Sequence, residues 1–385
     1  MDTRGFIYQE HRRFFAVVNE GLEELACAEL ERLGASDLKP IWRGVYFVAS
    51  PEVTLEVLFS ARLIGRLLAP LSSFDCHSSK YLLRRASEVP WETLLTPQKT
   101  FAVTATVANS KATHSQFVAL KLKDAICDRM REAAGGRPDV DRRRPDLRVL
   151  IHLERDYATI SADMGEGSRH RRGYRPEAGE APVPETVAAA LLAAAGWEGQ
   201  KPLLDPMCGS GTILAEAVMR AGNIPAGMNL NLKKIGARFL PDFGREALEE
   251  ARRKAMARAR PVPDDLIRGS DSDSRILQTA GENLARLPGG DEVRLRRGDF
   301  RDHPGLENGI IVCNPPWGIR LGEEEEAQQL VKEFGDWLKQ NCQGSEAWLI
   351  LGNRELVKYV GLKTTERVPV RIGALDGRFA KYELY

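Results

Sequence analysis

The stretch LLDPMCGSGTILAEAV, residues 203–218, joins an apolar run to a helical pattern through a turn that contains two glycines. The run ends at Asp205, and Gly209 and Gly211 allow the backbone to approach a ligand closely. The helix that follows offers its unpaired N-terminal N–H groups to the same ligand. The stretch therefore predicts the first strand, turn and helix of a sheet that binds a nucleoside-bearing cofactor.

Strands and helices alternate after this turn. The apolar runs predict strands at 202–205, 265–270, 293–298, 309–313 and 347–351, and a final hairpin in 366–385. Helices are predicted to begin near Gly211, Ser274 and Glu324. This alternation predicts an α/β fold with a doubly wound parallel sheet, which binds ligands at the carboxyl ends of its strands.

The sequence of this turn does not match two common nucleotide-binding motifs. A dinucleotide-binding turn needs a third glycine where Leu214 stands, and its ribose-binding acid should follow about 20 residues later. A P-loop needs Gly-Lys-Ser/Thr, which does not follow here. An adenosyl cofactor without phosphates remains, and a plain tight turn is the alternative that the motif alone leaves open.

The next two strands also end in residues that suit such a cofactor. Asp271 is placed to accept hydrogen bonds from ribose hydroxyls, and its alternative role is to cap the helix that begins at Ser274. Asp299 could accept from an adenine amino group while Phe300 packs on the ring, and an ordinary turn aspartate is the alternative.

The fourth strand runs into Asn314-Pro315-Pro316-Trp317. Proline has no N–H for a sheet and disfavours helix in the residue before it, so the strand must stop at Cys313 or Asn314. Asn314 and Trp317 then project from the edge that carries the cofactor turn. The alternative for Trp317 is a core aromatic at a strand end.

The first 165 residues show a different, α+β pattern. Residues 14–72 read strand, helix, strand, helix, strand, which predicts a small unit of ferredoxin-like order. A second unit is predicted from a strand at 101–108, a helix and strands in 147–164, and the apolar face of that helix is predicted to include Phe117, Leu120, Ile126 and Met130. Residues 165–185, rich in Gly, Pro and charge, are typical of a linker.

Composition limits the class of protein. The 385 residues are 43% hydrophobic and 28% charged, with a net charge of +1, so a nucleic-acid partner must be argued from local clusters. Six cysteines without a C-x-x-C pair favour free thiols in a reducing compartment. The N-terminal residues lack an apolar signal region and no run of about 18 apolar residues occurs, so we expect a cytoplasmic protein without a membrane partner.

The four strand-end motifs carry a resemblance. DPMCGSGT, GSDSD, RRGDF and NPPWGIRL, in this order and spacing, look like those of S-adenosylmethionine-dependent methyltransferases that modify exocyclic amines of nucleobases. With RRGYR, APVPETVAAALL and NIPAGMN, nearly the whole chain resembles the bacterial THUMP-domain methyltransferases related to the N-terminal half of the large-subunit rRNA guanine-N2 methyltransferase. Trp317 stands where that family usually has tyrosine.

The resemblance implies four regions. They are a ferredoxin-like domain at 1–72, a THUMP RNA-binding domain at 73–165, a basic linker at 166–185 and a Rossmann-like class I methyltransferase domain at 186–385. The implied S-adenosylmethionine site comprises Glu185, Thr186, Asp205, Cys208, Gly209, Ser210, Gly211, Thr212, Asp271, Ser272, Asp299, Phe300 and Asn314.

The amine chemistry gives NPPW a catalytic interpretation. The lone pair of an exocyclic amine is delocalised into the base, so the amine is a poor nucleophile. If Asn314 Oδ1 and the Pro315 carbonyl accept its hydrogens, the nitrogen becomes more tetrahedral and its lone pair points at the methyl donor. Pro315 and Pro316 fix that carbonyl, and Trp317 could stack on the base, which must be flipped out or presented from a loop.

Two basic clusters are candidates for RNA contact. The linker carries Arg169, Arg171, Arg172, Tyr174 and Arg175, and the second unit carries Lys111, His114, Lys121 and Lys123. Arginine and lysine can contact phosphates and Tyr174 could stack on a base, whereas a solvated linker is the alternative. The histidines have no metal-ligand spacing, so no metal is expected.

We therefore expect a monomeric enzyme that methylates guanine N2 in 23S rRNA. Guanine N2 of tRNA is the nearest alternative. An adenine-N6 methyltransferase of DNA or RNA would use the same Asn-Pro-Pro-aromatic chemistry, although an RNA-type N-terminal half disfavours DNA. A catalytically inactive RNA-binding factor would be expected to have a damaged cofactor turn or NPPW motif, and both are intact.

Overall fold

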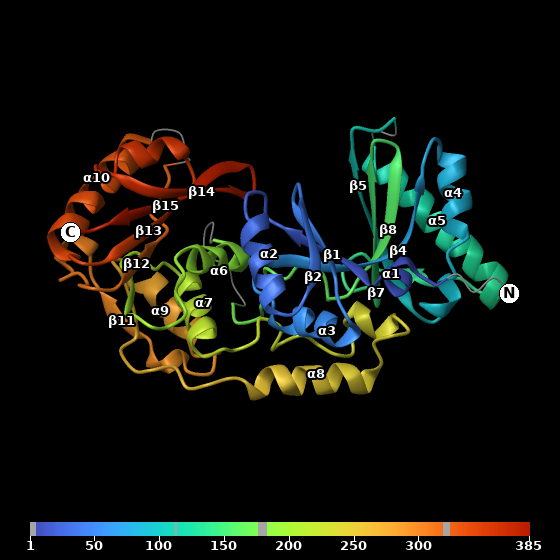
Figure 1. Cartoon of the computed structure of the whole chain (residues 1–385), viewed down its shortest axis with the longest axis horizontal. Helices are drawn as coiled ribbons and strands as arrows, with labels where there is room; N and C mark the ends of the chain where they lie inside the picture. Colours follow the sequence, from blue (N-terminus) through green and yellow to red (C-terminus); the bar gives the residue numbers. More distant parts are fainter. Residues whose placement is uncertain (1–4, 112–113, 176–182, 319–323) are drawn as a thin grey trace.

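The first part of the chain has the ferredoxin-like order (Figure 1). The computed structural model describes residues 5–111, 114–175, 183–318 and 324–385. The elements are α1 (Ile7–His11), β1 (Arg13–Val18), α2 (Glu23–Arg32), β2 (Ser36–Ile41), β3 (Gly44–Val48), α3 (Pro51–Ser60) and β4 (Ile64–Asp75). The predicted order is confirmed. It is completed by β2, which the apolar pattern missed because this strand is largely exposed at the edge of the sheet.

The second unit extends the same sheet. It contains α4 (Ser79–Ser87), the 3₁₀ helix η1 (Trp91–Thr93), β5 (Thr100–Ala108), α5 (Ser115–Ala134), β6 (Asp139–Val140), β7 (Leu147–Glu154) and β8 (Tyr157–Asp163). The strand order is β2-β3-β1-β4-β8-β7-β5-β6. Because β4 pairs with β8 from Leu68↔Asp163 to Asp75↔Tyr157, the two predicted units share one eight-stranded sheet.

The buried face of α5 differs from the predicted one. Ile126 and Met130 are buried as expected, together with Val118 and Leu122, but Phe117 and Leu120 are exposed. The prediction was wrong for these two side chains because a 20-residue helix has apolar residues on more than one face, and only the packing partners decide which face is covered.

The C-terminal part is the predicted doubly wound domain. Its helices are α6 (Glu185–Ala194), α7 (Thr212–Ala221), α8 (Arg245–Ala257), α9 (Ser274–Leu284) and α10 (Glu324–Asn341). Its strands are β9 (Leu203–Asp205), β10 (Ile267–Asp271), β11 (Arg294–Arg297), β12 (Ile310–Cys313), β13 (Glu346–Leu351), β14 (Thr364–Ile372) and β15 (Leu375–Glu383).

The order of this sheet is β11-β10-β9-β12-β13-β15-β14. Strands β9 to β13 are parallel, and the β14–β15 hairpin adds an antiparallel edge, as the strand pattern predicted. The order reverses at β9, so ligands are expected beside the carboxyl ends of β9 and β12. Short 3₁₀ helices η3 (Gly290–Glu292), η4 (Phe300–Asp302) and η5 (Arg354–Lys358) complete the connections.

The segment between α7 and β10 is not part of either core sheet. It includes η2 (Gly236–Phe239) and α8, and it passes along the N-terminal part of the chain before it returns (Figure 1). Gly227 N donates to Phe59 O at 2.7 Å, and Ala237 N donates to Met164 O at 2.9 Å. The two parts of the chain are therefore joined by backbone hydrogen bonds as well as by the linker.

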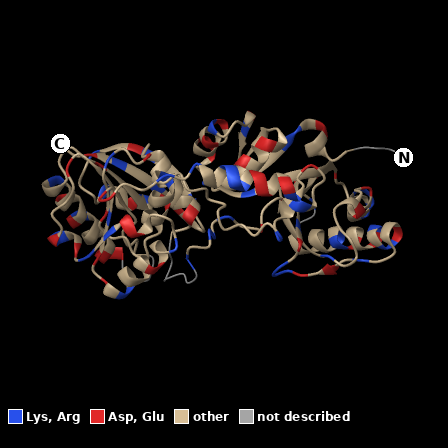
Figure 2. Cartoon of the chain, turned by 90° about the horizontal axis from the view of Figure 1, so that it is seen from below, with Lys and Arg blue, Asp and Glu red and all other residues tan. Residues whose placement is uncertain are grey.

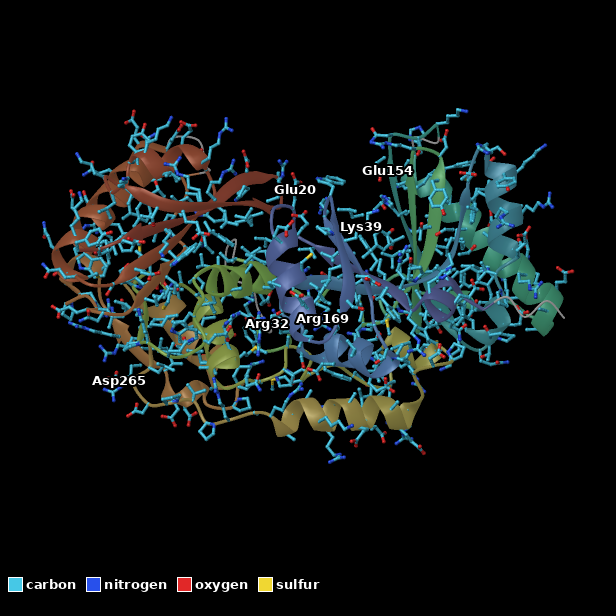
Figure 3. All side chains as sticks on the ribbon, viewed as in Figure 1. Glu20, Arg32, Lys39, Glu154, Arg169 and Asp265 are labelled. Carbon is cyan, nitrogen blue, oxygen red and sulfur yellow. The ribbon has the colours of Figure 1, made fainter. Side chains whose placement is uncertain are left out.

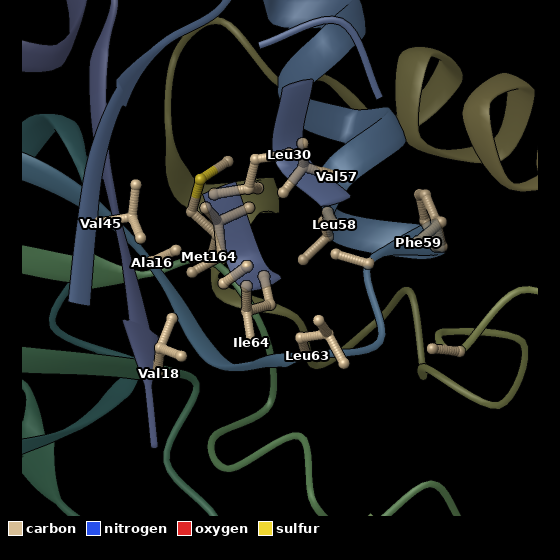
Figure 4. Packing of buried hydrophobic residues seen from close by; sticks show 14 of the residues in the cluster. Ala16, Val18, Leu30, Val45, Val57, Leu58, Phe59, Leu63, Ile64 and Met164 are labelled. Atoms are coloured by element: carbon tan, nitrogen blue, oxygen red, sulfur yellow. The ribbon is translucent and has the colours of Figure 1, made fainter. Parts of the chain in front are cut away.

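The apolar core is continuous across this junction. In the N-terminal part, Val45 on β3 belongs to the same buried cluster as Leu30, Leu58 and Met164, which Figure 4 labels. The same cluster of buried residues extends through α6 and α7 to the first strands of the C-terminal sheet. In the described part of the chain, no helix combines the length and hydropathy needed to cross a bilayer.

Candidate cofactor and amine site

The turn after β9 has the backbone conformation that its glycines suggest. Gly209 and Gly211 have φ angles of 54° and 77°, which L side chains rarely adopt. A Cβ at Gly211 would lie 3.1 Å from Ala280 Cβ, whereas a Cβ at Gly209 would have no atom within 4 Å. Gly211 therefore allows close packing of α7 on α9, and Gly209 borders open space in which a ligand can approach the backbone.

Asp271 holds this turn in place. Its Oδ2 accepts from Gly209 N at 2.9 Å, and its Oδ1 accepts from Asp273 N at 3.0 Å. The N-cap of α9 is Asp273, which accepts from Arg275 N at 2.8 Å, so Asp271 does not have the capping role that was its alternative. Asp271 brings the ends of β9 and β10 together and retains acceptor capacity for ribose hydroxyls.

Asp205 and Cys208 are the buried residues at the start of the turn. Both are buried, and burial raises the pKa of the Asp205 carboxyl and of the Cys208 thiol well above their ordinary values. Met207 N donates to Asp205 Oδ1 at 3.3 Å, and Cys208 N donates to Ser270 O at 2.9 Å. These two hydrogen bonds fix the backbone of the turn, one within the turn and one to β10.

The remaining residues of the predicted cofactor site surround the turn. Asn283 Nδ2 donates to Ser210 O at 3.0 Å, and Ser272 is exposed after β10. Glu185 and Thr186 begin α6 and are buried, and Thr212 begins α7. Their positions fit the predicted site.

The predicted adenine contact by Phe300 is wrong. Phe300 is buried in η4, with its ring 5.2 Å from Phe334 and 6.0 Å from Trp337, centroid to centroid. The Arg301 guanidinium covers it at 4.7 Å from the centroid. Asp299 caps η4 and pairs with Arg301 at 2.8 Å, so it has the turn role that was its alternative, and an adenine amino group would compete with that guanidinium.

Asn314 follows β12 at the same edge of the sheet. Strand β12 pairs with β9 through Ile310↔Leu203 and Ile311↔Leu204, which brings Asn314 just past the level of Asp205. The Oδ1 atom of Asn314 is buried and, among the described residues, has no hydrogen-bond partner. A buried acceptor without a donor is costly, which is typical of an atom that meets its partner only when a ligand binds.

The rest of the NPPW motif frames this acceptor. Pro315 is buried and Pro316 is exposed. Trp317 is half-buried: its Nε1 donates to Ile350 O at 3.1 Å, and its ring lies against the Cα of Gly352. One side of the indole thus belongs to the core, and base stacking is left to its exposed part. Residues 319–321, the last three of the longer stretch NPPWGIRL, lie outside the described residues.

The basic linker does not have the predicted exposure. Arg169, Arg172 and Tyr174 are buried, and Arg175 is nearly so (Figure 3 labels Arg169). Arg169 donates to Leu58 O and, at 2.8 Å, to Ala61 O at the end of α3. The RNA-contact prediction is wrong for these four residues, because the arginines satisfy carbonyls and carboxylates at the junction between the two parts of the chain. In the described part of the linker, Arg171 remains exposed.

The second basic cluster is accessible. Lys111 and His114 precede α5 and are exposed, and with His77 and Phe117 they line a cavity of about 360 Å³; Lys121 lies further along α5 and is half-buried. The Lys121 ammonium lies 5.5 Å from the Phe117 ring centroid. Basic and acidic residues are interspersed over the chain (Figure 2), and this cluster is the predicted basic cluster that stays accessible.

Comparison with known families assigns each part of the chain. Residues 172–381 match the RMKL-like methyltransferase domain, residues 77–163 match the THUMP domain, and residues 13–68 match the RlmL ferredoxin-like domain. The last two matches fall on the two halves of the continuous N-terminal sheet.

Relatives along the whole chain carry related names. The Synechocystis protein slr0064, described as a candidate RNA methyltransferase, is 36% identical, and the alignment covers 97% of both chains. Ribosomal RNA large subunit methyltransferase K/L of Syntrophotalea carbinolica is also 36% identical over 97% of this chain, but only 53% of the relative is covered. The chain thus spans about half the length of the K/L relatives.

Solved structures share the entire fold. SMU.472, crystallised with SAH and described as a methyltransferase, has a TM-score of 0.86 at 24% identity, with 97% of this chain and 98% of that chain covered. A Listeria monocytogenes protein described as a predicted N6-adenine-specific DNA methylase has a TM-score of 0.85 at 25% identity, with 99% and 97% covered.

Proposed function

Because the chain belongs to the family of RMKL-like methyltransferases, we propose that it transfers a methyl group from S-adenosylmethionine to the exocyclic N2 amine of a guanine in 23S rRNA. S-adenosylmethionine would supply the sulfonium methyl group and leave as S-adenosylhomocysteine, and the methylated amine would lose one proton to solvent. The residues of this chain would bind the cofactor, orient the base and accept hydrogen bonds from the amine. The reaction takes place in the cytoplasm, where the RNA is made.

The observation that carries the proposal is the buried Oδ1 of Asn314, which has no hydrogen-bond partner among the described residues. It lies at the carboxyl end of β12, next to the strand that leads into the cofactor turn. An acceptor at this place would accept a hydrogen bond from an exocyclic amine and orient the nitrogen lone pair toward the methyl donor. A backbone fixed by Pro315 and Pro316 keeps that acceptor in position.

The cofactor assignment is supported by the shape and polarity of the turn. A ligand can approach the backbone at Gly209, and the Asp271 carboxylate lies beside it. Together with the N-terminus of α7, these features suit a ribose and a short polar chain. The phosphate cradle that a dinucleotide or ATP needs is not supported by the sequence of this turn, since Leu214 replaces the third glycine and no lysine follows.

The RNA assignment rests on the match to the THUMP domain and on the exposed basic cluster. Lys111, Lys121 and His114 can contact phosphates, and the exposed Phe117 offers an apolar surface for a base. The names of the K/L relatives favour large-subunit rRNA as the substrate.

The test is a methyl-transfer assay on the whole chain with labelled S-adenosylmethionine. Total rRNA and total tRNA are offered separately, and the labelled nucleosides are then identified. We expect N2-methylguanosine in large-subunit rRNA and none with Asn314→Ala. N2-methylguanosine in tRNA would show that tRNA, and not rRNA, is the substrate. N6-methyladenosine would overturn the guanine assignment in favour of the activity named for the Listeria structure.

A further inference from the structure

The buried arginine of the linker that lies nearest to the cofactor turn is Arg175. Its Nη1 donates to Thr212 Oγ1 at 2.9 Å, and its Nη2 lies 3.3 Å from Glu185 Oε2. Thr212 and Glu185 are the first residues of α7 and α6. The guanidinium therefore bridges the N-termini of the two helices that border the cofactor turn, and only 9% of its side chain is exposed.

This placement brings two opposite charges to the start of both helices. Helix N-termini carry partial positive charge, so a guanidinium beside two of them favours an anion nearby. Glu185 is the carboxylate in contact with Arg175, and it is 2% exposed. Its Oε2 has no hydrogen-bond partner among the described residues, although the Arg175 charge is close. The site thus offers a cation that can take a carboxylate and a buried carboxylate oxygen that can take a donor.

A set of buried contacts holds Arg175 in this position. Arg172 Nε donates to Glu216 Oε1 at 2.6 Å, Tyr174 OH donates to the same oxygen at 3.1 Å, and Arg172 Nη2 donates to Arg62 O at 2.7 Å. Glu216 and Thr212 lie one turn apart on α7, so the linker runs along one face of that helix. The buried Arg172–Glu216 pair thus anchors the backbone of the linker three residues before Arg175.

We propose that Arg175 and Glu185 bind the zwitterionic amino-acid end of S-adenosylmethionine, Arg175 through the α-carboxylate and Glu185 through the α-ammonium. The inference rests on the proposed function and adds to it a linker residue as a determinant of cofactor recognition. The linker then has two tasks: it joins the RNA-binding part to α7, and it supplies one charge of the cofactor site.

The test compares two ligands that share the adenosine part. S-adenosylhomocysteine carries the amino-acid end, and 5′-methylthioadenosine lacks it. Their dissociation constants are measured by calorimetric titration of the full chain and of Arg175→Met, Arg175→Lys and Glu185→Gln. Arg253→Met, on the exposed surface of α8 and paired only with Glu250 among the described residues, is the matched control.

We expect Arg175→Met and Glu185→Gln to weaken S-adenosylhomocysteine by about 10- to 100-fold, the loss typical of a hydrogen bond to a charged group, and to leave 5′-methylthioadenosine within about twofold. Arg175→Lys should restore part of the affinity for S-adenosylhomocysteine, and Arg253→Met should change neither ligand.

Equal weakening of both ligands by Arg175→Met and Arg175→Lys would overturn the inference, because it would show that Arg175 only supports the fold of the turn. No weakening of either ligand would overturn it as well. If the unaltered chain bound 5′-methylthioadenosine and S-adenosylhomocysteine equally well, the amino-acid end would not be recognised at all. If it bound neither, the cofactor assignment itself would fail, which is a separate and recognisable result.

Discussion

Replacement of Arg172 by methionine tests whether the linker is a buried clamp or an RNA contact. The side chains of Arg172 and Glu216 are 1% and 0% exposed, and their ion pair measures 2.6 Å. Removal of the guanidinium would leave the Glu216 carboxylate buried, with Tyr174 OH at 3.1 Å as its remaining hydrogen-bond donor among the described residues. Loss of one partner of a buried pair typically costs about 3 to 5 kcal/mol.

The assay is urea unfolding of the whole chain, followed by tryptophan fluorescence, to which the buried Trp197 and Trp348 of the C-terminal domain contribute. With a slope of roughly 3 kcal/mol per molar urea, the midpoint should fall by about 1 to 1.7 M. The double variant Arg172→Met/Glu216→Met should recover most of this loss, because it removes the unpaired charge while it keeps apolar volume. Arg171→Met, one residue away and exposed, should leave the midpoint unchanged.

A midpoint shift below about 0.3 M for Arg172→Met would refute the clamp, since an exposed ion pair is worth at most about 1 kcal/mol. A loss in the double variant equal to the sum of two single losses would also refute it, because independent residues add and coupled residues do not.

Four further results are expected. Asn314→Ala should lower kcat by about 100- to 1,000-fold, the usual cost of one transition-state hydrogen bond, while calorimetry shows unchanged S-adenosylhomocysteine affinity; a parallel loss of affinity would make Asn314 structural. Gly211→Ala should lower stability by about 1 to 2 kcal/mol because of the positive φ, and it should also impair cofactor binding; unchanged thermal unfolding would contradict the strained turn. Burial raises the pKa of Glu185, so the unaltered chain should lose stability relative to Glu185→Gln as pH rises from below the ordinary carboxyl range through the folded pKa; thermal unfolding over this pH range measures the difference, and a difference independent of pH would exclude this cause. Lys111→Gln with Lys121→Gln should weaken RNA binding and reduce the slope of log K against log salt by roughly 1.5, and an unchanged slope would remove these lysines from the interface.

The doubly wound domain was predictable in detail from local pattern. Short apolar runs bounded by turn residues fixed β9, β10, β12 and β13 to within two residues, because buried parallel strands are almost purely apolar. Residues 222–265 could not be predicted in the same way. Their contacts are with the distant N-terminal part of the chain, as in the bond from Gly227 N to Phe59 O, and no local periodicity records such a partner.

The site shows the same division. Asp271 and Asn314 were placed correctly at strand ends, because parallel strands bring all their carboxyl ends to one edge. Phe300 was not, because an aromatic residue after a strand can turn toward either a ligand or the core, and here Phe334 and Trp337 cover it.

The sequence by itself determined the parallel strands of the C-terminal domain, the glycine turn and the NPPW end of β12, since these depend on backbone preferences of consecutive residues. Only the tertiary structure decided the use of the linker arginines. A run of charges usually lies in solvent, and its residues are buried only where separate parts of the chain present matching acceptors. In this protein Arg169 donates to Leu58 O and Ala61 O at the end of α3, and Arg172 donates to Glu216 on α7. These arginines therefore connect the RNA-binding part of the chain to the helix that follows the cofactor turn.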